Sequence, residues 1–156
     1  MAELTIGTPQ MIDIAQLHHC LKNTKLRLKE DYGWDNEFVD GAVNEYYRFL
    51  IICKMFPLTK FVPGKVVDKV WHDHILHTKE YIEFCNRYFG EYVHHTPLDR
   101  SLGTKHDFQP TIDKYTSLFG HNPPAKFWTT DVKLLEPQFK QHIVSYSHES
   151  GGGCCR

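Results

Sequence analysis

The sequence predicts a mainly α-helical fold, a single-domain bundle of four to five helices. The chain has 156 residues, which is a usual size for one domain and enough to bury one core. Apolar residues recur at helical spacing in several stretches, and glycine or proline follows these stretches. We therefore expect a helical domain over residues 1–146 and a mobile tail, rich in glycine and cysteine, over residues 147–156.

The first two helices are predicted over residues 9–31 and from Asp35 to just before Pro57. Thr8 is suited to cap the first helix, because a proline follows it in the first helical position. Leucines then recur at helical spacing up to Gly33. Asp35 is suited to cap the second helix, whose apolar stripe predicts a buried face.

A third helix is predicted to run without interruption from about Val66 to Phe89, and Gly90 is a residue type that commonly ends helices. The polar stretch 96–106 contains a proline and a glycine, so it is expected to be a loop. A fourth helix follows this loop and ends at Gly120.

The remaining chain is predicted to close the bundle. Two successive prolines, Pro123 and Pro124, favour an extended turn that carries Phe127 and Trp128 onto the helices as a lid. A weaker fifth helix is expected over residues 131–146.

Charge and hydropathy narrow the classes of partner. The 18 lysines and arginines nearly balance the 19 aspartates and glutamates, so the basic excess that nucleic-acid binding needs is absent. The sequence shows no secretory signal and no apolar run long enough to cross a bilayer. We therefore expect a cytoplasmic protein that binds neither nucleic acid nor membrane, with a protein or small molecule of unknown identity as its partner.

Histidine is the residue type that points to chemistry. The five cysteines are odd in number and three of them stand alone, so no disulfide framework is expected. They form no CxxC pair, so the usual cysteine zinc spacing is absent too, and the role of Cys154 and Cys155 is open. Eleven histidines are many for a chain of this length. A metal ion would therefore be held by imidazole and carboxylate groups.

The histidines are densest between Val67 and His95, a segment that contains the sequence VDKVWHDHIL and ends in a pair of histidines. This segment and its flanks resemble the family called glycine-rich domain-containing protein-like, over roughly residues 22–128. The resemblance implies a helical domain of largely unassigned function, with glycine- and cysteine-rich C-terminal segments in many members. It implies no catalytic residue by name. The residues and runs that carry it, beyond that sequence, are Gly33-Trp34, Tyr47 to Leu50, Val62-Pro63, Thr78, Tyr81, Cys85, Phe89-Gly90, His94-His95 and Leu118 to Gly120.

Within that segment, Asp68 and His72 are the best local pair of metal ligands. On an unbroken helix they lie about 40° apart, whereas His74 lies at about 240° from Asp68, on another face. Side chains four residues apart on a helix are about 5–6 Å from each other, close enough to share one ion. The alternative is that Asp68 is only a favourable acid near a helix N-terminus, with a partly exposed His72 beside it and no ion.

His74 falls in the apolar stripe of the third predicted helix, together with Trp71, so both are expected to face the core. A buried imidazole needs partners for its ring nitrogens, and Thr78 or Tyr81 could provide them. We therefore interpret His74 first as a hydrogen-bonded core residue and second as a candidate metal ligand.

His95 is too far along the chain to contact His72 if the third predicted helix is continuous. From His72 to Gly90 an unbroken helix rises about 27 Å, and the five extended residues that follow return at most about 17 Å. Direct contact between His95 and His72 therefore requires a break in the helix. Without one, we expect His18 or His19 near Asp68 and His72, and a second cluster at the other end of the bundle: His94, His95, His106 and Asp107.

Three function classes follow from these patterns. The first is a helical domain that binds a divalent transition metal, zinc, iron or copper, through Asp68 and His72, with His95 and His74 as further candidates. The second is a metal-dependent enzyme with two histidines and one carboxylate, in which Tyr81 or His74 acts as a proton donor. The third is a non-catalytic interaction module that presents aromatic side chains: Tyr46, Tyr47, Phe127 and Trp128.

Overall fold

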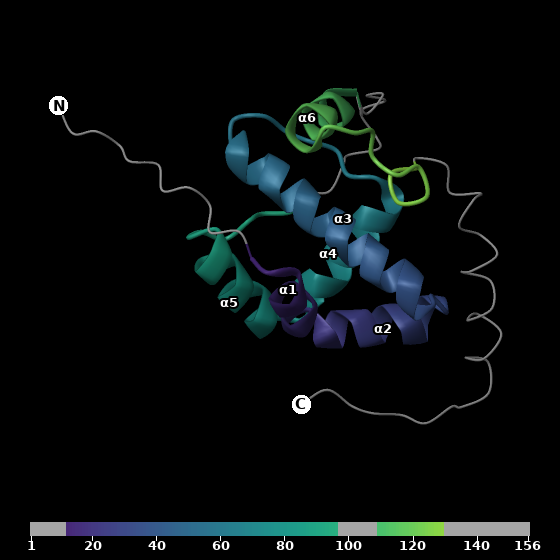
Figure 1. The fold of residues 1–156 in the computed structure, drawn as a ribbon. Coiled ribbons are helices and arrows are strands. Elements are labelled where there is room, and N and C mark those ends of the chain that lie inside the picture. Colours follow the sequence, from purple (N-terminus) through teal and green to yellow (C-terminus); the bar gives the residue numbers. More distant parts are fainter. Residues whose placement is uncertain (1–11, 97–108, 130–156) are drawn as a thin grey trace.

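The computed structural model describes residues 12–96 and 109–129, and these ranges contain six helices and no strand (Figure 1). The predicted mainly helical fold is therefore confirmed. In the same ranges, no helix is both long and apolar enough to cross a bilayer. The helices are α1 (Ile14–Cys20), α2 (Lys22–Tyr32), α3 (Asn36–Met55), α4 (Lys65–Leu76), α5 (Thr78–Tyr88) and α6 (Gln109–Phe119).

Some predictions concern residues outside the described ranges, so the structure does not test them. These are the cap at Thr8, the histidine and aspartate at 106 and 107, the helix over 131–146 and the tail over 147–156.

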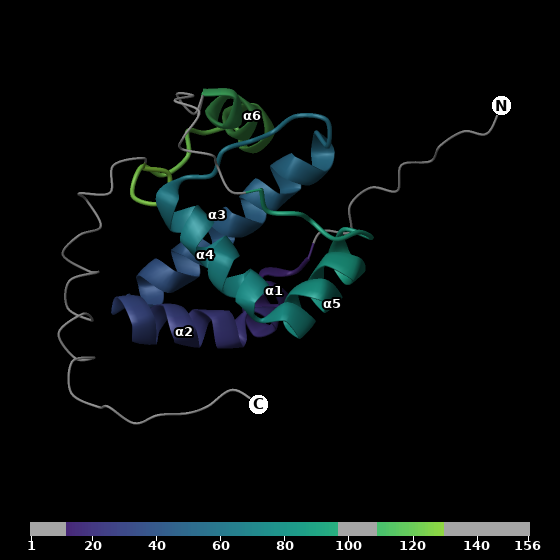
Figure 2. The same ribbon diagram turned by 180° about the vertical axis from the view of Figure 1, so that it is seen from behind.

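The long helix α3 is the centre of the fold. Its start is confirmed, because the Asp35 side chain accepts a hydrogen bond from the backbone N–H of Phe38 at 2.8 Å. Its end at Met55 also agrees with the prediction, two residues before Pro57. α4 packs along α3, whereas α1 and α2 lie on the opposite side of α3 from α6 (Figures 1 and 2).

The first predicted helix, over 9–31, is wrong as a continuous element. The chain bends at Leu21, which has φ −97° and ψ 19° and separates α1 from α2. Leu21 is fully buried at the bend, as are Leu17 before it and Leu28 after it. The bend therefore separates two short helices of different direction, and the leucines of both remain in one core.

The third predicted helix is also broken, at His77, and this break matters most for the site. In a continuous helix the N–H of His77 would bond to the carbonyl of Asp73. Instead the His77 ring donates from Nδ1 to that carbonyl at 2.8 Å, and the His77 N–H turns to the carbonyl of His74 at 3.1 Å. The histidine side chain thus replaces the main-chain hydrogen bond, α4 ends, and α5 turns back beside it (Figures 1 and 2).

The predicted lid is confirmed. Phe127 and Trp128 are 4% and 3% exposed. The ring of Phe127 lies against α3 where Gly41 has no side chain, and a Cβ there would lie 2.4 Å from the ring. Gly64 likewise allows the backbone of Trp128 to approach closely, because a Cβ on Gly64 would lie 2.5 Å from the Cα of Trp128. The lid is further fixed by a hydrogen bond from the Lys65 N–H to the Thr129 carbonyl at 2.9 Å.

A buried carboxylate joins the lid and α6 to α3. Glu45 is 3% exposed, and its Oε2 accepts hydrogen bonds from the Tyr115 hydroxyl at 2.9 Å and from Nε1 of Trp128 at 2.7 Å. Its other oxygen, Oε1, lies 2.6 Å from the guanidinium of Arg48, which also donates to the Tyr115 hydroxyl. The charge of Glu45 is thus paired and hydrogen-bonded, as a buried charge must be.

Candidate metal centre

Two of the candidate ligands come from the first three turns of α4. The valines of this helix and Trp71 face the core, and the Trp71 ring packs on Phe49 of α3 with 5.3 Å between ring centroids, as predicted. The opposite face carries Asp68 and His72, whose side chains are 31% and 48% exposed. Nε2 of His72 lies 3.7 Å from Oδ2 of Asp68, so the two side chains are as close as their spacing on one turn of helix predicts.

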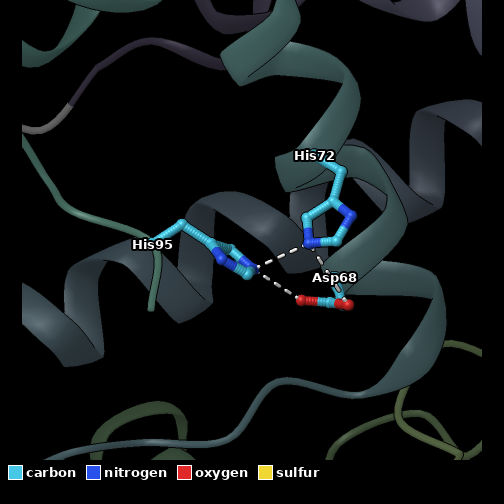
Figure 3. A group of neighbouring side chains, drawn as sticks. All are labelled: Asp68, His72 and His95. Atoms are coloured by element: carbon cyan, nitrogen blue, oxygen red, sulfur yellow. Dashed lines mark hydrogen bonds and ion pairs between the residues drawn. The ribbon is translucent and has the colours of Figure 1, made fainter. Parts of the chain in front are cut away.

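His95 completes the group, contrary to the expectation that it would lie at the far end of a straight helix. Nε2 of His95 lies 2.9 Å from Oδ1 of Asp68 and 3.0 Å from Nε2 of His72 (Figure 3). The break at His77 is the reason, because α5 runs in a new direction from the end of α4 and the extended segment after α5 crosses back toward α4.

Tyr81 anchors the segment that carries His95. The hydroxyl of Tyr81 accepts a hydrogen bond from Nε1 of Trp71 at 2.9 Å and donates one to the carbonyl of Val93. Burial raises the pKa of Tyr81, so the hydroxyl keeps the proton that it donates. The ring of His95 then stands against the ring of Trp71, with 4.4 Å between ring centroids. Tyr81 is therefore a positioning residue, a role that its place in an apolar stripe did not indicate.

Hydrogen bonding alone satisfies this group poorly. Nε2 of His95 makes two short contacts, with Asp68 and with His72, and a neutral imidazole nitrogen carries either one proton or one lone pair. One proton shared between two acceptors forms two weak, bent hydrogen bonds. All three side chains point toward one place (Figure 3). In the described part of the chain, they form the group whose ligand atoms, all within 4.8 Å of one another, could hold one metal ion.

The electrostatic surroundings favour the protonation states that bind metals. Burial raises the pKa of Asp68, but the hydrogen bond from His95 and the charges of His72, His95 and Lys65 outweigh burial and leave this pKa below its usual value. Burial lowers the pKa of His72, with the charge of Asp68 opposing and those of His95 and Lys69 adding to the decrease. A carboxylate is therefore charged and an imidazole neutral near neutral pH, as coordination requires.

A comparison with known families identifies the chain. A family model described as UCP032817-like matches residues 9–119, which is more than half of the sequence and includes all three residues of the group. The chain belongs to the UCP032817-like family. It is also 33% identical to Glycine-rich domain-containing protein 1 of Arabidopsis thaliana over 99 residues, and the resemblance found in the sequence is thereby confirmed.

The UCP032817-like chain is much shorter than that relative. The match covers 58% of this chain and 12% of the Arabidopsis protein. No solved structure matches the chain.

His74 does not join the other three residues. It is fully buried and faces the core, as predicted, but its partner is neither Thr78 nor the hydroxyl of Tyr81. Nδ1 of His74 lies 3.0 Å from the hydroxyl oxygen of Tyr46, which reaches across from α3. Burial lowers the pKa of His74 to about 3, so this imidazole is neutral in the folded protein. Its place is structural, within the contact between α3 and α4.

The other histidines expected near Asp68 and His72 lie elsewhere. His18 is half-buried between α1, α2 and α3, where its ring nitrogens lie 2.9 and 3.0 Å from Asn44 and Lys25. The helix is broken, so the alternative to the two end clusters holds for His95, which lies with Asp68 and His72, whereas residues 106 and 107 of the second cluster are outside the described ranges. His94 packs on Tyr92 and remains exposed, even though it is adjacent to His95.

The aromatic side chains proposed as a partner surface are mostly in the core. Tyr46, Phe127 and Trp128 are 0%, 4% and 3% exposed. Tyr47 is half-buried and accepts a hydrogen bond from the Ile12 N–H at 2.9 Å. These four rings therefore do not form a surface that a partner could contact.

Proposed function

We propose that this chain binds a divalent transition metal through Asp68, His72 and His95. The observation that carries the proposal is the convergence of three ligand atoms, within 4.8 Å of one another, from α4 and from a segment more than twenty residues later. Here both the break at His77 and the bond from Tyr81 to Val93 serve to bring His95 to α4.

The separations within the group support a single ion. Zinc binds imidazole nitrogen at about 2.0–2.1 Å in tetrahedral geometry, which places two ligand atoms about 3.3 Å apart. The three separations in the group are 2.9, 3.0 and 3.7 Å, on both sides of that value. An ion would therefore need only small side-chain adjustments. Two imidazoles and one carboxylate suit zinc, iron and copper, and metal analysis of the purified protein distinguishes them.

The direct test is metal content with matched histidine variants. Protein made without a histidine tag should bind one ion per chain, and His95→Ala and His72→Ala should each abolish binding. His94→Ala is the matched control, because it removes the neighbouring exposed histidine from the same segment and should leave binding unchanged. Asp68→Asn should weaken binding, since a neutral amide replaces a charged oxygen ligand. Equal metal affinity in His95→Ala and His94→Ala would overturn the proposal.

Thermal unfolding gives an independent check. A metal that binds only the folded state stabilises it by mass action, by about 2.7 kcal/mol at a hundred times the dissociation constant. A chelator should therefore lower the melting temperature of the wild type and leave that of His95→Ala unchanged. His74→Ala should lose stability with and without chelator, because it removes a core side chain that the metal does not touch.

A further inference from the structure

We propose that the metal keeps one coordination position open to solvent, and that a small anion binds there. This inference rests on the proposed metal site. In a tetrahedral site with four protein ligands no position remains, whereas catalytic and exchangeable sites keep three protein ligands and a fourth position for water or another ligand. The described residues supply three ligand groups and no fourth.

The position of the group on α4 leaves the fourth vertex accessible. The side chains of His72 and Asp68 are 48% and 31% exposed, whereas that of His95 is 12% exposed and backed by the ring of Trp71. The protein therefore covers the group from the side of His95 and leaves it uncovered on the outer face of α4. A ligand that approaches from solvent meets the metal on that face, where water would otherwise bind.

The charges around the group favour an anion over a neutral ligand. A divalent ion beside the carboxylate of Asp68 and two neutral imidazoles leaves one net positive charge. Lys65 and Lys69 precede Asp68 and His72 by three residues each, so all four side chains share one stripe of α4. The ammonium of Lys69 is held in place over the ring of Tyr32 at 4.7 Å. The resulting positive field attracts small anions such as carboxylates or azide, which would displace the bound water.

Cobalt with azide as the probe tests the inference. Co²⁺ reports its coordination number through its visible absorption, so addition of cobalt to metal-free protein should give a spectrum that His95→Ala abolishes. Azide added to the cobalt protein should then change that spectrum in a saturable way, because it replaces water at the open position. An absent cobalt spectrum would reject the metal site itself. A cobalt spectrum that azide leaves unchanged would reject the open position alone.

Charge variants of α4 provide a second test, because they should change azide binding and cobalt binding in opposite directions. Lys65→Gln removes a positive charge from the stripe, so it should weaken azide binding by about two- to fivefold and tighten cobalt binding by a similar factor. A merely structural lysine would change both affinities in the same direction. Lys79→Gln is the control, because Lys79 is an exposed lysine on α5, away from the stripe, and should change neither. Azide binding that is equal in both variants would contradict the role of the stripe.

Discussion

Removal of one hydroxyl group, in Tyr81→Phe, should both destabilise the fold and weaken metal binding. The hydroxyl of Tyr81 has two partners, Nε1 of Trp71 and the carbonyl of Val93. The first partner belongs to a side chain that is only 6% exposed, so its N–H would stay buried without an acceptor. The second fixes the segment that delivers His95 to the site.

The size of each effect follows from these two partners. A buried donor left without a partner costs about 1–3 kcal/mol, and loss of the hydrogen bond to the carbonyl of the half-buried Val93 adds to that cost. The free energy of unfolding should therefore fall by about 2–3 kcal/mol. Loss of about 1.4 kcal/mol from the docking of the His95 segment would lower its docking equilibrium constant about tenfold, and the apparent metal affinity would fall by at most that factor.

Urea unfolding in chelator measures the first effect, and a metal titration of the folded protein measures the second. Tyr92→Phe is the matched control. Its ring packs on Tyr81 in the same region, but it is 38% exposed, so loss of its hydroxyl should change neither quantity by much. The reasoning is refuted if Tyr81→Phe and Tyr92→Phe have the same stability and the same metal affinity.

Three further predictions concern the core. Gly64→Ala should destabilise the fold by about 1–3 kcal/mol, because the new Cβ would lie 2.5 Å from the Cα of Trp128; a urea midpoint equal to that of the wild type would contradict this contact. Trp71→Ala should cost about 3–5 kcal/mol in urea unfolding, the range for a buried aromatic side chain, and a loss below about 1 kcal/mol would place the ring at the surface. Burial lowers the pKa of His74 to about 3 in the folded state. The free energy of unfolding therefore keeps the full contribution of neutral His74 above a pH of about 6.5 and decreases as the pH drops from there toward 3. Urea titrations in chelator should find a loss of about 2 kcal/mol between pH 7 and pH 5 that is missing in His74→Gln; equal losses in both proteins would exclude this histidine as its source.

The parts of the fold that were predictable from sequence depend on neighbouring residues. The cap at Asp35 and the burial of Trp71 follow from a cap position and from an apolar stripe, which are local patterns. The pairing of Asp68 with His72 follows from one turn of helix in the same way. The lid was predictable because two prolines restrict the chain just before Phe127 and Trp128.

The helix break at His77 was not predictable from these patterns. The apolar stripe of α4 continues in phase through Tyr81 and Cys85, and no glycine or proline interrupts it. The break depends on a choice between two donors for the Asp73 carbonyl, the His77 ring and the His77 backbone. Because the distance from His72 to His95 was estimated along a straight helix, this one hydrogen bond decided whether the third ligand could reach the site.

The hydrogen bonds of Glu45 limit how the chain can be divided. All three ligand residues lie before residue 97, so a fragment that ends there would contain the whole proposed site. Such a fragment would lack Tyr115 and Trp128, which are both donors to Oε2 of Glu45 and two of the rings that cover α3. It would leave a carboxylate without those donors beside an exposed apolar helix, a combination that favours aggregation over folding. A minimal metal-binding version of this protein must therefore extend at least through the lid, although no residue after His95 belongs to the proposed ligand group.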